Sequence, residues 1–490
     1  MRLPGAEDTI AAIATAPGRG ALAVVRLSGP AAHAIGARVL DPWRATPRAA
    51  YRAILRHPDS GLAVEHPVVT VYAGPKSYTG EDSVELSVHG GAVAPAVTLA
   101  ALLAAGARQA LPGEFTRRAV AHGKLDVLQA EAVAVAVDAR SRAMFTAAQA
   151  QLEGGLSRRI AALRDAILHV EALIAYDIDF PEEDEGPVDE ERVLEAVQRA
   201  RSAVDTLLAT AETGEMVRSG ATVVIAGAPN TGKSSLFNAL VGDARAIVTE
   251  IPGTTRDAIE AVIDVGPWPV RLIDTAGLRA TDDVVERLGI EVSERWLARA
   301  DMVLACGDSP DSLGAAVERI GEMFAEEGGG PVVIAVRTKG DAAGGPPGFN
   351  LPDDGNPRGI ERAPIASKSR GDGSPTGELA PIEPHAITVS AHTGAGLAVL
   401  THRIQDELSR RHHLGDADAP LLTRERHVRA VQVAREELDH FLRARQSQEV
   451  PATIAAVHLR AATHALESLI GAVDVEDVLD RVFRSFCVGK

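Results

Sequence analysis

The segment GAPNTGKSS at residues 227–235 constrains the fold of this chain more than any other stretch. It follows an apolar, strand-like run, TVVIA, and it opens a helix-like run, SSLFNALVG. The spacing matches G-x-x-x-x-G-K-[ST], whose glycines let backbone N–H groups face a phosphate at a helix N-terminus. We therefore expect a strand, a phosphate-binding loop and a helix, with Lys233 reaching the β- and γ-phosphates and the Ser234 hydroxyl binding Mg²⁺.

The alternation of strand and helix continues through the middle of the chain. The apolar runs PVRLIDTAG, DMVLACGD, PVVIAVRTKGD and HAITVSAHTG are separated by stretches with helical spacing. Buried apolar strands that alternate with helices are typical of a mostly parallel sheet with helices on both faces. The sequence thus predicts a Ras-like P-loop domain in this region.

Two motifs after the phosphate loop supply groups for a metal ion and for the terminal phosphate. GTTRD at 253–257 has the Thr255 hydroxyl as a second ligand for Mg²⁺, and DTAG at 274–277 ends the strand VRLI. Asp274 would hold Mg²⁺ through water, and the Gly277 N–H can sense a γ-phosphate. Segments of this kind become ordered around a nucleoside triphosphate and relax after hydrolysis.

Two later motifs predict which base is bound. TKGD at 338–341 ends a strand. The Asp341 carboxylate can accept from the ring N–H and the exocyclic amine of guanine, whereas adenine has no matching donors. SAH at 390–392 would place a backbone N–H on the guanine carbonyl. These four motifs, in this order after the phosphate loop, predict a GTPase. Thr338 stands where Asn is usual, so we expect weaker nucleotide binding with the choice of guanine retained.

The means of hydrolysis needs a separate argument. Many GTPases carry a Gln just after D-x-x-G to orient water, but Leu278 stands here and an apolar side chain cannot do so. The site therefore needs other means to stabilise charge in the transition state. The side-chain oxygen of Asn230, with carbonyls from 247–255, could hold a monovalent cation. Asn230 could equally make a hydrogen bond that stabilises the loop, and the residues alone favour neither reading.

Length and composition exclude several classes of protein. A chain of 490 residues, 46% hydrophobic and 24% charged, suggests about three globular domains. Two distant cysteines give neither a disulfide framework nor a zinc spacing, which favours the cytoplasm. The N-terminus has no signal-peptide pattern, and no apolar run suits a membrane span. The net charge of −17 argues against a chain that binds nucleic acid over a broad surface by charge alone.

Changes in pattern divide the chain into regions. Residues 1–125 combine β-branched or alternating runs with an Ala/Leu helix, and residues 126–218 carry apolar residues at helical spacing. The P-loop region occupies 219–410 and contains a Gly-, Pro- and Ser-rich insertion at 341–384 that we expect to be disordered. Residues 411–490 are helical again. We predict a P-loop domain inserted between two helical segments that pack as one domain.

Beyond these motifs, the sequence resembles the MnmE/TrmE family of tRNA-modification GTPases, within the TrmE-Era-EngA-like GTPases. The resemblance rests on seven segments that lie in three regions and cover nearly the whole chain apart from the insertion. The segments are DTIAAIATAPGRGALAVVRLSGP, GPKSYTGEDSVELSVHGG, LPGEFTRRAVAHGKLDVLQAEAV, GAPNTGKSSLFNAL, IVTEIPGTTRD, DTAGLR and the terminal FCVGK.

The resemblance implies a function and partners. It implies a homodimer whose N-terminal domain binds a tetrahydrofolate derivative, 5,10-methylene- or 5-formyl-tetrahydrofolate, and mediates dimerisation. With the flavoprotein MnmG, which carries FAD, a heterotetramer would convert C5 of the wobble uridine in certain tRNAs to the (carboxymethyl)aminomethyl form. GTP hydrolysis would need Mg²⁺ and K⁺. Affinity for nucleic acid comes largely from contacts of Lys and Arg with phosphates. We therefore expect a basic partner to provide most of the affinity for tRNA.

The resemblance also implies roles for individual residues of the GTPase site. Glu286 would orient the attacking water in place of the missing Gln, with Lys233 also in the catalytic set; the residues alone describe Glu286 as a solvated helix charge. The K⁺ ligands would be Asn230, Thr249, Ile251 through its carbonyl, and Thr254, and the Mg²⁺ ligands would be Ser234 and Thr255. The GTP contacts would be Asn230, Thr231, Gly232, Lys233, Ser234, Ser235, Thr249, Thr255, Asp274, Thr275, Ala276, Gly277, Thr338, Lys339, Asp341, Ser390 and Ala391.

For the folate, the resemblance implies contacts from Arg26, Glu85, Lys124 and Lys490. Such groups suit a carboxylate tail and the edge of a pterin ring. From the residues alone, Arg26 and Glu85 would more simply form an ordinary ion pair at the edge of a sheet.

The two cysteines lead to different expectations. The resemblance places Cys487, in the C-terminal tail with Lys490, near the folate and the substrate base as a catalytic thiol, and a nearby cation favours the thiolate. The alternative is that Phe486 and Cys487 pack as hydrophobes. Cys306, in the strand DMVLAC, we expect to be buried structure. The 15 histidines show no metal-ligand spacing, and we assign them no role.

A second function remains open at this point: a ribosome-assembly or signalling GTPase that works only as a conformational switch. The P-loop, Leu278 and Asn230 fit either function. The folate-like N-terminal motifs and the FCVGK tail favour the enzyme of tRNA modification.

Overall fold

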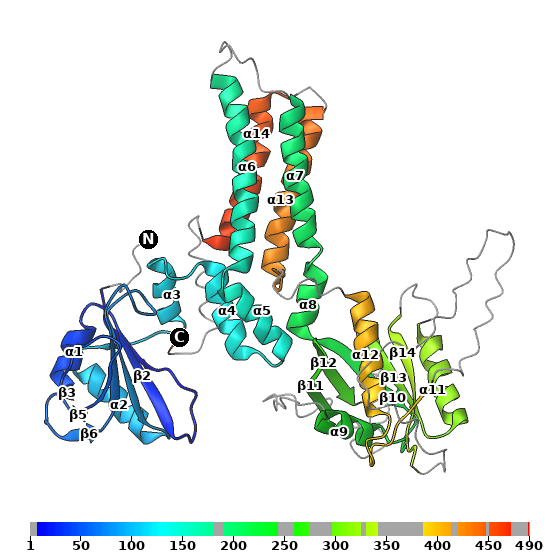
Figure 1. The fold of residues 1–490 in the computed structure, drawn as a ribbon, viewed down its shortest axis with the longest axis horizontal. Helices are drawn as coiled ribbons and strands as arrows, with labels where there is room; N and C mark the ends of the chain where they lie inside the picture. Colours follow the sequence, from blue (N-terminus) through cyan, green and yellow to red (C-terminus); the bar gives the residue numbers. More distant parts are fainter. Residues whose placement is uncertain are drawn as a thin grey trace, which may run out of the picture. The chain divides into compact units, whose positions relative to one another are not determined.

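The computed structural model divides the chain into two compact units. One unit comprises residues 1–139, 144–218 and 414–490, and the other comprises 140–143 and 219–413. The predicted combination of a mixed α/β part, a helical part and a P-loop part is confirmed (Figure 1). The residues that the structure describes are 7–179, 190–243, 259–274, 296–324, 330–341, 386–412, 420–446, 450–471 and 489.

The first unit begins with a sheet of six strands in the order β4-β7-β8-β2-β1-β9. Neighbouring strands are antiparallel except β1 and β9, which are parallel. On the central strands, every second residue, such as Val25, Leu27, Val84 and Leu86, is fully buried, as strand geometry requires. The strands are β1 (Ile10–Ile13), β2 (Leu22–Ser28), β4 (Ala50–Arg52), β7 (Val68–Tyr72), β8 (Ser83–His89) and β9 (Arg108–Gln109).

Smaller elements complete this N-terminal part. Helix α2 packs on the sheet through Ala101 and Leu102, and Pro95 lies in its first turn, where a missing N–H costs no helical hydrogen bond. The remaining elements are a three-stranded antiparallel sheet of β3 (Leu40–Asp41), β5 (Ile54–Arg56) and β6 (Ala63–Glu65), and the helices α1 (Ala32–Val39), α2 (Val93–Ala104) and α3 (Glu114–Ala121).

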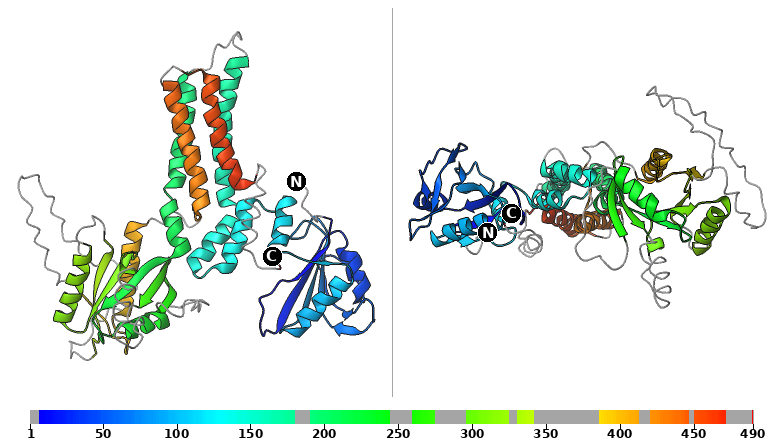
Figure 2. Two further views of the ribbon diagram at one scale, coloured as in Figure 1. Left: turned by 180° about the vertical axis from the view of Figure 1, so that it is seen from behind. Right: turned by 90° about the horizontal axis from the view of Figure 1, so that it is seen from below.

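Four long helices of the same unit form a bundle, visible from both sides in Figures 1 and 2. Helix α14 packs on α13 and α6, and α7 packs on the same two helices. One apolar core holds Leu163 and Val197 from the first chain segment with Leu438 and Leu459 from the second. The two helical segments therefore share a core, as predicted. The helices are α4 (Val127–Asp138), α5 (Arg142–Leu152), α6 (Gly155–Asp179), α7 (Glu190–Leu208), α8 (Ala211–Ser219), α13 (Glu425–Gln446) and α14 (Ala452–Ile470).

A buried cluster of charged groups joins these two segments. Glu131 of α4 accepts from Arg426 Nε at 2.6 Å and contacts His427 Nε2 at 2.6 Å, and both Glu131 and His427 are fully buried. Burial alone would raise the pKa of Glu131, but hydrogen bonds from His427 and Arg426 outweigh it and lower the pKa to about 2. Burial lowers the pKa of His427, so a neutral imidazole donates from Nε2 to an ionised carboxylate.

The second unit holds a six-stranded sheet in the order β11-β12-β10-β13-β14-β15. All neighbours are parallel except β11 and β12, which confirms the mostly parallel sheet. Val224 and Ala226 of β10 share an apolar core with Ile320 of α11, while the residues between them point to the other face. The elements are β10 (Ala221–Gly227), α9 (Lys233–Asp243), β11 (Ile259–Val265), β12 (Trp268–Asp274), β13 (Met302–Gly307), α11 (Pro310–Met323), β14 (Val332–Arg337), β15 (Ile387–Thr388) and α12 (Leu397–Arg411).

The sequence predicts no membrane span and a disordered insertion at 341–384. Within the described ranges, no helix combines the length and apolar character that crossing a membrane requires. The insertion predicted at 341–384 lies outside the described residues apart from Asp341.

Candidate functional site

The phosphate loop lies between the end of β10 and the start of α9, as its sequence predicts. Gly227 ends β10 with φ of 150° and lies directly against the neighbouring strand β13. A Cβ at this position would come within 2.2 Å of the Cys306 carbonyl oxygen, so any side chain here would collide with backbone. The loop can therefore approach β13 only because residue 227 is a glycine.

Lys233 and Thr231 are held inside the loop. The Lys233 ammonium donates to the Ala228 carbonyl at 2.6 Å, and the Thr231 hydroxyl donates to the same oxygen at 2.8 Å. Lys233 is only 6% exposed. The cation thus lies across the loop at the N-terminus of α9, the end of a helix that favours anions.

Asn230 and Ser234 occupy the loop and the first turn of α9. Asn230 has φ of 61°, in the left-handed region that Asn tolerates better than most residues. This backbone requirement is a reason for Asn that the sequence did not reveal, and it is compatible with either role considered for the side chain. Ser234 and Ser235 are exposed in the first helical turn, so their hydroxyls are accessible to a ligand.

Asp274 ends β12 beside the loop. It pairs in register with Ile225 of β10 and its side chain is fully buried. Cys306 on the adjacent strand is also fully buried, as predicted; burial raises the pKa of its thiol to about 12, with Lys233 and Asp274 close enough to act on it electrostatically. Cys306 is therefore an inert core residue.

Thr338 connects the base-side loop to the phosphate loop. Its hydroxyl donates to the Thr231 carbonyl and contacts the Gly307 carbonyl at 3.2 Å, and the residue is buried. A Cβ on Gly232 would lie 3.5 Å from Thr338 Cβ, in ordinary contact. Although Thr lacks the amide of the usual Asn, its hydroxyl still ties the two loops together.

Asp341 and Ser390 bring the last two motifs together. Ser390 Oγ donates to Asp341 Oδ1 at 2.8 Å, and the Gly340 N–H donates to the Val389 carbonyl at 3.0 Å. The hydrogen bond from Ser390 lowers the pKa of Asp341. Asp341 is therefore an ionised acceptor that is hydrogen-bonded to Ser390, the residue before Ala391. Lys339 donates to Asp308 at 2.9 Å on the same side of the sheet.

Several predicted site residues lie outside the described residues. They are Thr249, Ile251, Thr254, Thr255, Thr275, Ala276, Gly277, Glu286, Cys487 and Lys490.

Arg26 and Glu85, predicted to touch a folate, face each other across β2 and β8. Arg26 Nε donates to Glu85 Oε1 at 2.9 Å, and Tyr72 donates to Glu85 Oε2 at 3.4 Å. Because β2 and β8 are central strands, the pair does not lie at a sheet edge, which corrects the simpler reading of the two residues. Both side chains keep about a quarter of their surface exposed, at 22% and 26%.

Two aromatic residues that the sequence did not single out surround Arg26. Its guanidinium carbon lies 5.2 Å from the centre of the Tyr78 ring and 5.6 Å from that of Phe115. Burial raises the pKa of Tyr78, so its phenol stays protonated and contacts the Thr116 hydroxyl at 2.9 Å. Tyr78 lies in the motif GPKSYTGED, but only the fold brings Phe115 to it.

Lys124 and Gly489 both contact the N-terminal part of the chain. The Lys124 ammonium donates to the Pro75 carbonyl at 3.1 Å, in the loop that also carries Tyr78. Gly489, near the chain end, is buried with φ of 105°, and a Cβ there would come within 2.4 Å of the Ile13 carbonyl oxygen. Ile13 is the neighbour of Ala12, which pairs with Arg26 across β1 and β2. Gly489 is therefore packed against β1, the strand next to β2, which carries Arg26.

Comparisons with known proteins extend over the whole chain. The family model for the GTP-binding protein TrmE N-terminus matches residues 9–124, and the model for the MnmE helical domain matches residues 127–487. The tRNA modification GTPase MnmE of Heliobacterium modesticaldum is 40% identical, covering 99% of each chain. Those of Moorella thermoacetica (38% identical; 99% of this chain, 100% of the relative) and Azoarcus sp. (39%; 100% and 99%) are similar.

A weaker match among solved structures is the G domain of the T. maritima FeoB iron transporter. It is 23% identical and covers 38% of this chain and 97% of that chain, with a TM-score of 0.24. At that TM-score the match carries no argument about fold or function beyond what the similar MnmE sequences show. Because the relatives match from end to end and a family model spans most of the sequence, the chain belongs to the MnmE, or TrmE, family of tRNA-modification GTPases.

Proposed function

We propose that this chain is a GTP hydrolase of tRNA modification. With the flavoprotein MnmG, it uses a folate one-carbon unit to build the (carboxymethyl)aminomethyl group at C5 of the wobble uridine in certain tRNAs. The observation that carries the proposal is the hydrogen bond from Thr338 to the Thr231 carbonyl, which joins the phosphate loop with Lys233 to the base-side loop with Asp341. Family membership supports tRNA modification as the process that hydrolysis serves.

Within this proposal, each described residue of the GTP site has a role. Lys233 neutralises the β- and γ-phosphates, and Asp341 accepts from the two donors of guanine while the backbone of Ala391 contacts its carbonyl. Mg²⁺ supplies charge neutralisation between the phosphates. Ser234 in the first turn of α9 and the Asp274 carboxylate are hard oxygen donors of the kind that Mg²⁺ prefers.

The remaining parts of the hydrolytic step rest on the resemblance. Asn230, Thr249, Ile251 and Thr254 would hold K⁺, whose positive charge would serve as an arginine finger does in other GTPases. Thr255 is the second hydroxyl ligand of Mg²⁺, and Glu286 orients the attacking water because Leu278 cannot.

The folate is proposed to bind at the N-terminal sheet. Arg26 and Lys124 can pair with its carboxylates, and Glu85 can accept from the pterin edge. Tyr78 supports the choice of an aromatic ligand, since its ring is exposed beside Arg26, whereas Phe115 is fully buried and can only hold the Arg26 guanidinium from below. The contact of Gly489 with Ile13 supports a place for Cys487 and Lys490 near this ligand.

The proposed assembly is a cytoplasmic homodimer that joins MnmG, which holds FAD, in a heterotetramer. The chain carries a net charge of −17. Because tRNA phosphates are bound mainly by Lys and Arg, MnmG is proposed to supply most of the affinity for tRNA.

The hydrolytic proposal is tested by GTP turnover of the full-length protein in KCl and in NaCl at equal ionic strength. We expect much faster turnover in KCl. Asn230→Gly removes the side-chain oxygen but keeps the positive φ, so it should abolish the preference for K⁺ while GTP remains bound. Equal rates of the unmodified protein in the two salts would remove K⁺ from the mechanism.

Folate binding separates this function from that of a conformational switch in ribosome assembly or signalling. The full-length protein should bind 5-formyl-tetrahydrofolate in equilibrium dialysis, and Arg26→Gln should weaken the binding because it removes the cation. Arg56→Gln, on β5 with 43% of its side-chain surface exposed, is the matched control. If the unmodified protein binds no folate, the switch function becomes the better description.

The proposed thiol is tested in cells whose only copy of the protein carries Cys487→Ser. We expect the wobble-uridine modification to vanish from tRNA, as measured by mass spectrometry, while the purified variant still hydrolyses GTP. Persistence of the modification would make Cys487 a packing residue.

A further inference from the structure

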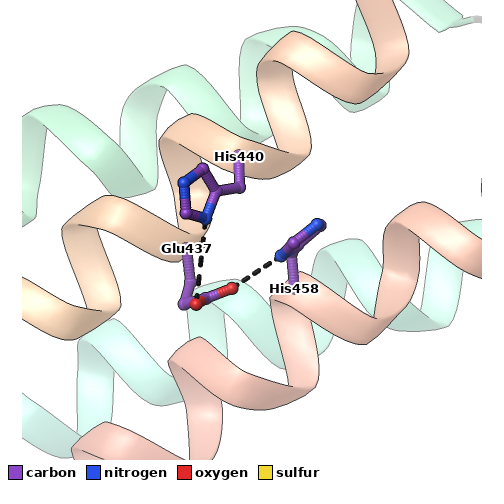
Figure 3. A group of neighbouring side chains, drawn as sticks. All are labelled: Glu437, His440 and His458. Atoms are coloured by element: carbon purple, nitrogen blue, oxygen red, sulfur yellow. Dashed lines mark hydrogen bonds and ion pairs between the residues drawn. The ribbon is translucent and has the colours of Figure 1, made fainter.

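The helical bundle holds a group of three ligating side chains that the histidine spacing in the sequence did not indicate. Glu437 and His440 lie one turn apart on α13, and His458 lies on α14, the next helix along the chain. Figure 3 shows the two imidazoles turned toward the carboxylate from the two helices. One nitrogen or oxygen of each residue lies within 4.8 Å of those of the other two.

Glu437 contacts both histidines of this group. His458 Nδ1 lies 2.6 Å from Glu437 Oε2, and His440 Nδ1 lies 3.8 Å from Glu437 Oε1. The two imidazole ring centres are 5.2 Å apart. Donors around a tetrahedral Zn²⁺ at bond lengths of about 2.0–2.1 Å lie roughly 3.3 Å from one another. Small changes in side-chain torsion therefore bring all three donors to that spacing.

The backbone of α13 and α14 that carries these three residues is held in place by the core of the bundle. Glu437, His440 and His458 each precede a buried residue of the shared core, namely Leu438, Phe441 and Leu459. The three ligating residues consequently lie along the margin of the packed seam between α13 and α14. His440 is exposed and the other two are partly exposed, so an ion can enter from solvent. Ligands placed on packed helices are held more accurately than ligands on loops.

From this arrangement we propose that Glu437, His440 and His458 bind one divalent transition-metal ion, best matched by Zn²⁺, which links α13 to α14. This inference is independent of the GTPase function proposed above and goes beyond it.

The chemistry of the donors selects the class of metal. Two imidazole nitrogens with one carboxylate oxygen are a recognised ligand set for Zn²⁺, with water in the fourth position. Mg²⁺ and Ca²⁺ prefer oxygen ligands and match a site with two nitrogens poorly. Glu-x-x-His on one helix, completed from another helix, is also a pattern by which bundles present metal ligands. Bound metal would fasten the two helices of the second chain segment to each other.

The test is a zinc titration of the full-length protein after treatment with a chelator, read by competition with a chromophoric zinc indicator. The variants His440→Ala and His458→Ala should each lose one equivalent of bound Zn²⁺, or bind it at least about tenfold more weakly. His464→Ala is the matched control, because His464 is an exposed histidine of α14 outside the group. It should bind as the unmodified protein does.

A second readout separates a metal site from a simple ion pair. Zn²⁺ should raise the Tm of the unmodified protein and of His464→Ala, because an ion bound only by the folded state stabilises it. It should leave the Tm of His440→Ala unchanged, and this variant keeps the contact between His458 and Glu437. If all four proteins bind Zn²⁺ equally, or if Zn²⁺ shifts the Tm of His440→Ala as much as that of the control, the three residues form an ion pair and no metal site.

Discussion

The phosphate loop of the second unit and the charged cluster around Glu131 in the first unit handle polar groups in opposite ways. In the loop, the side chains of Lys233, Thr231 and Thr338 are tied to backbone carbonyls. In the cluster, the Glu131 carboxylate is satisfied by side chains, Arg426 and His427, that lie in the other helical segment. The polar side chains of the loop are thus paired with backbone carbonyl groups, whereas those of the cluster are paired with one another.

The difference has an energetic consequence. A side chain that donates to a backbone carbonyl contributes about 0.5–1.5 kcal/mol net, and its loss leaves a neutral acceptor unpaired. A buried ion pair adds little net stability, because the attraction between its charges is offset by the cost of removing them from water. Removing one partner leaves the other buried group uncompensated and costs about 3–5 kcal/mol. The helical bundle should therefore be far more sensitive to single changes in its charged cluster than the loops of the P-loop domain are to theirs.

The largest effect is expected for Glu131→Ala. The change leaves the fully buried His427 N–H without its acceptor and the partly exposed Arg426 guanidinium without its carboxylate, so the free energy of unfolding of the helical bundle should fall by about 3–5 kcal/mol. Urea unfolding of the full-length protein, followed by circular dichroism, measures it. Glu195→Ala removes an exposed carboxylate from an i,i+4 pair and should cost less than about 1 kcal/mol. Equal losses for the two variants would contradict the contrast.

The same cluster should give the bundle a defined pH dependence. The folded-state pKa of His427 lies below 6.5 and that of Glu131, at about 2, lies below 4.5, so the unfolded state binds protons first as the pH falls. Stability should decline below about pH 6.5, and a further part, about 3 kcal/mol for Glu131, should be lost between pH 4.5 and 2. Glu131→Gln should remove that second part. A bundle as stable at pH 3 as at pH 7 would contradict this.

A smaller effect is expected for Asp341→Asn at the base-side loop. The amide cannot accept from both guanine donors, so affinity for GTP should fall about a hundredfold. Affinity for xanthosine triphosphate should rise, because its base presents a carbonyl where guanine has an amine. Fluorescent-nucleotide displacement measures both, with the exposed Asp311→Asn as control. Unchanged selectivity would mean that Asp341 does not read the base.

The smallest effect is expected for Thr338→Val, which removes the hydroxyl that reaches the Thr231 and Gly307 carbonyls. Thermal unfolding of the P-loop domain should report a loss of about 1–2 kcal/mol, with weaker GTP binding. Thr338→Ser keeps the hydroxyl and should behave nearly as the unmodified protein. If Ser is as damaging as Val, the methyl group and not the hydroxyl joins the loops.

The two regions also differ in how far their sequence predicts them. The phosphate loop could be predicted because its turn, its glycines and the start of α9 lie within nine consecutive residues, and the motifs DTAG, TKGD and SAH lie at the ends of strands. The sequence predicts that Thr338, in place of Asn, weakens nucleotide binding. It does not predict the hydrogen bond by which the Thr338 hydroxyl joins its own loop to the phosphate loop at Thr231. The contact between Glu131 and His427 joins residues 296 positions apart, and no local pattern indicates it.

The N-terminal sheet and the bundle show the same limit. Arg26 and Glu85 could be read as a pair, but strand order, which places them at the centre of the sheet, is not a local property of sequence. Glu437 and His458 are 21 positions apart on separate helices, so their meeting depends on how α13 and α14 align. Strands of two or three residues, such as β3 and β9, carry too few residues to show an alternating pattern.

The central claim, that hydrolysis of GTP by this chain serves tRNA modification, is tested most directly in cells that have this protein as their only member of the family. Mass spectrometry of tRNA nucleosides compares the unmodified protein with Lys233→Ala, which loses the phosphate-loop cation. The account predicts (carboxymethyl)aminomethyl uridine at the wobble position with the first and its loss with the second. Modification that persists with Lys233→Ala, or that is absent with both proteins although they are folded, would contradict it.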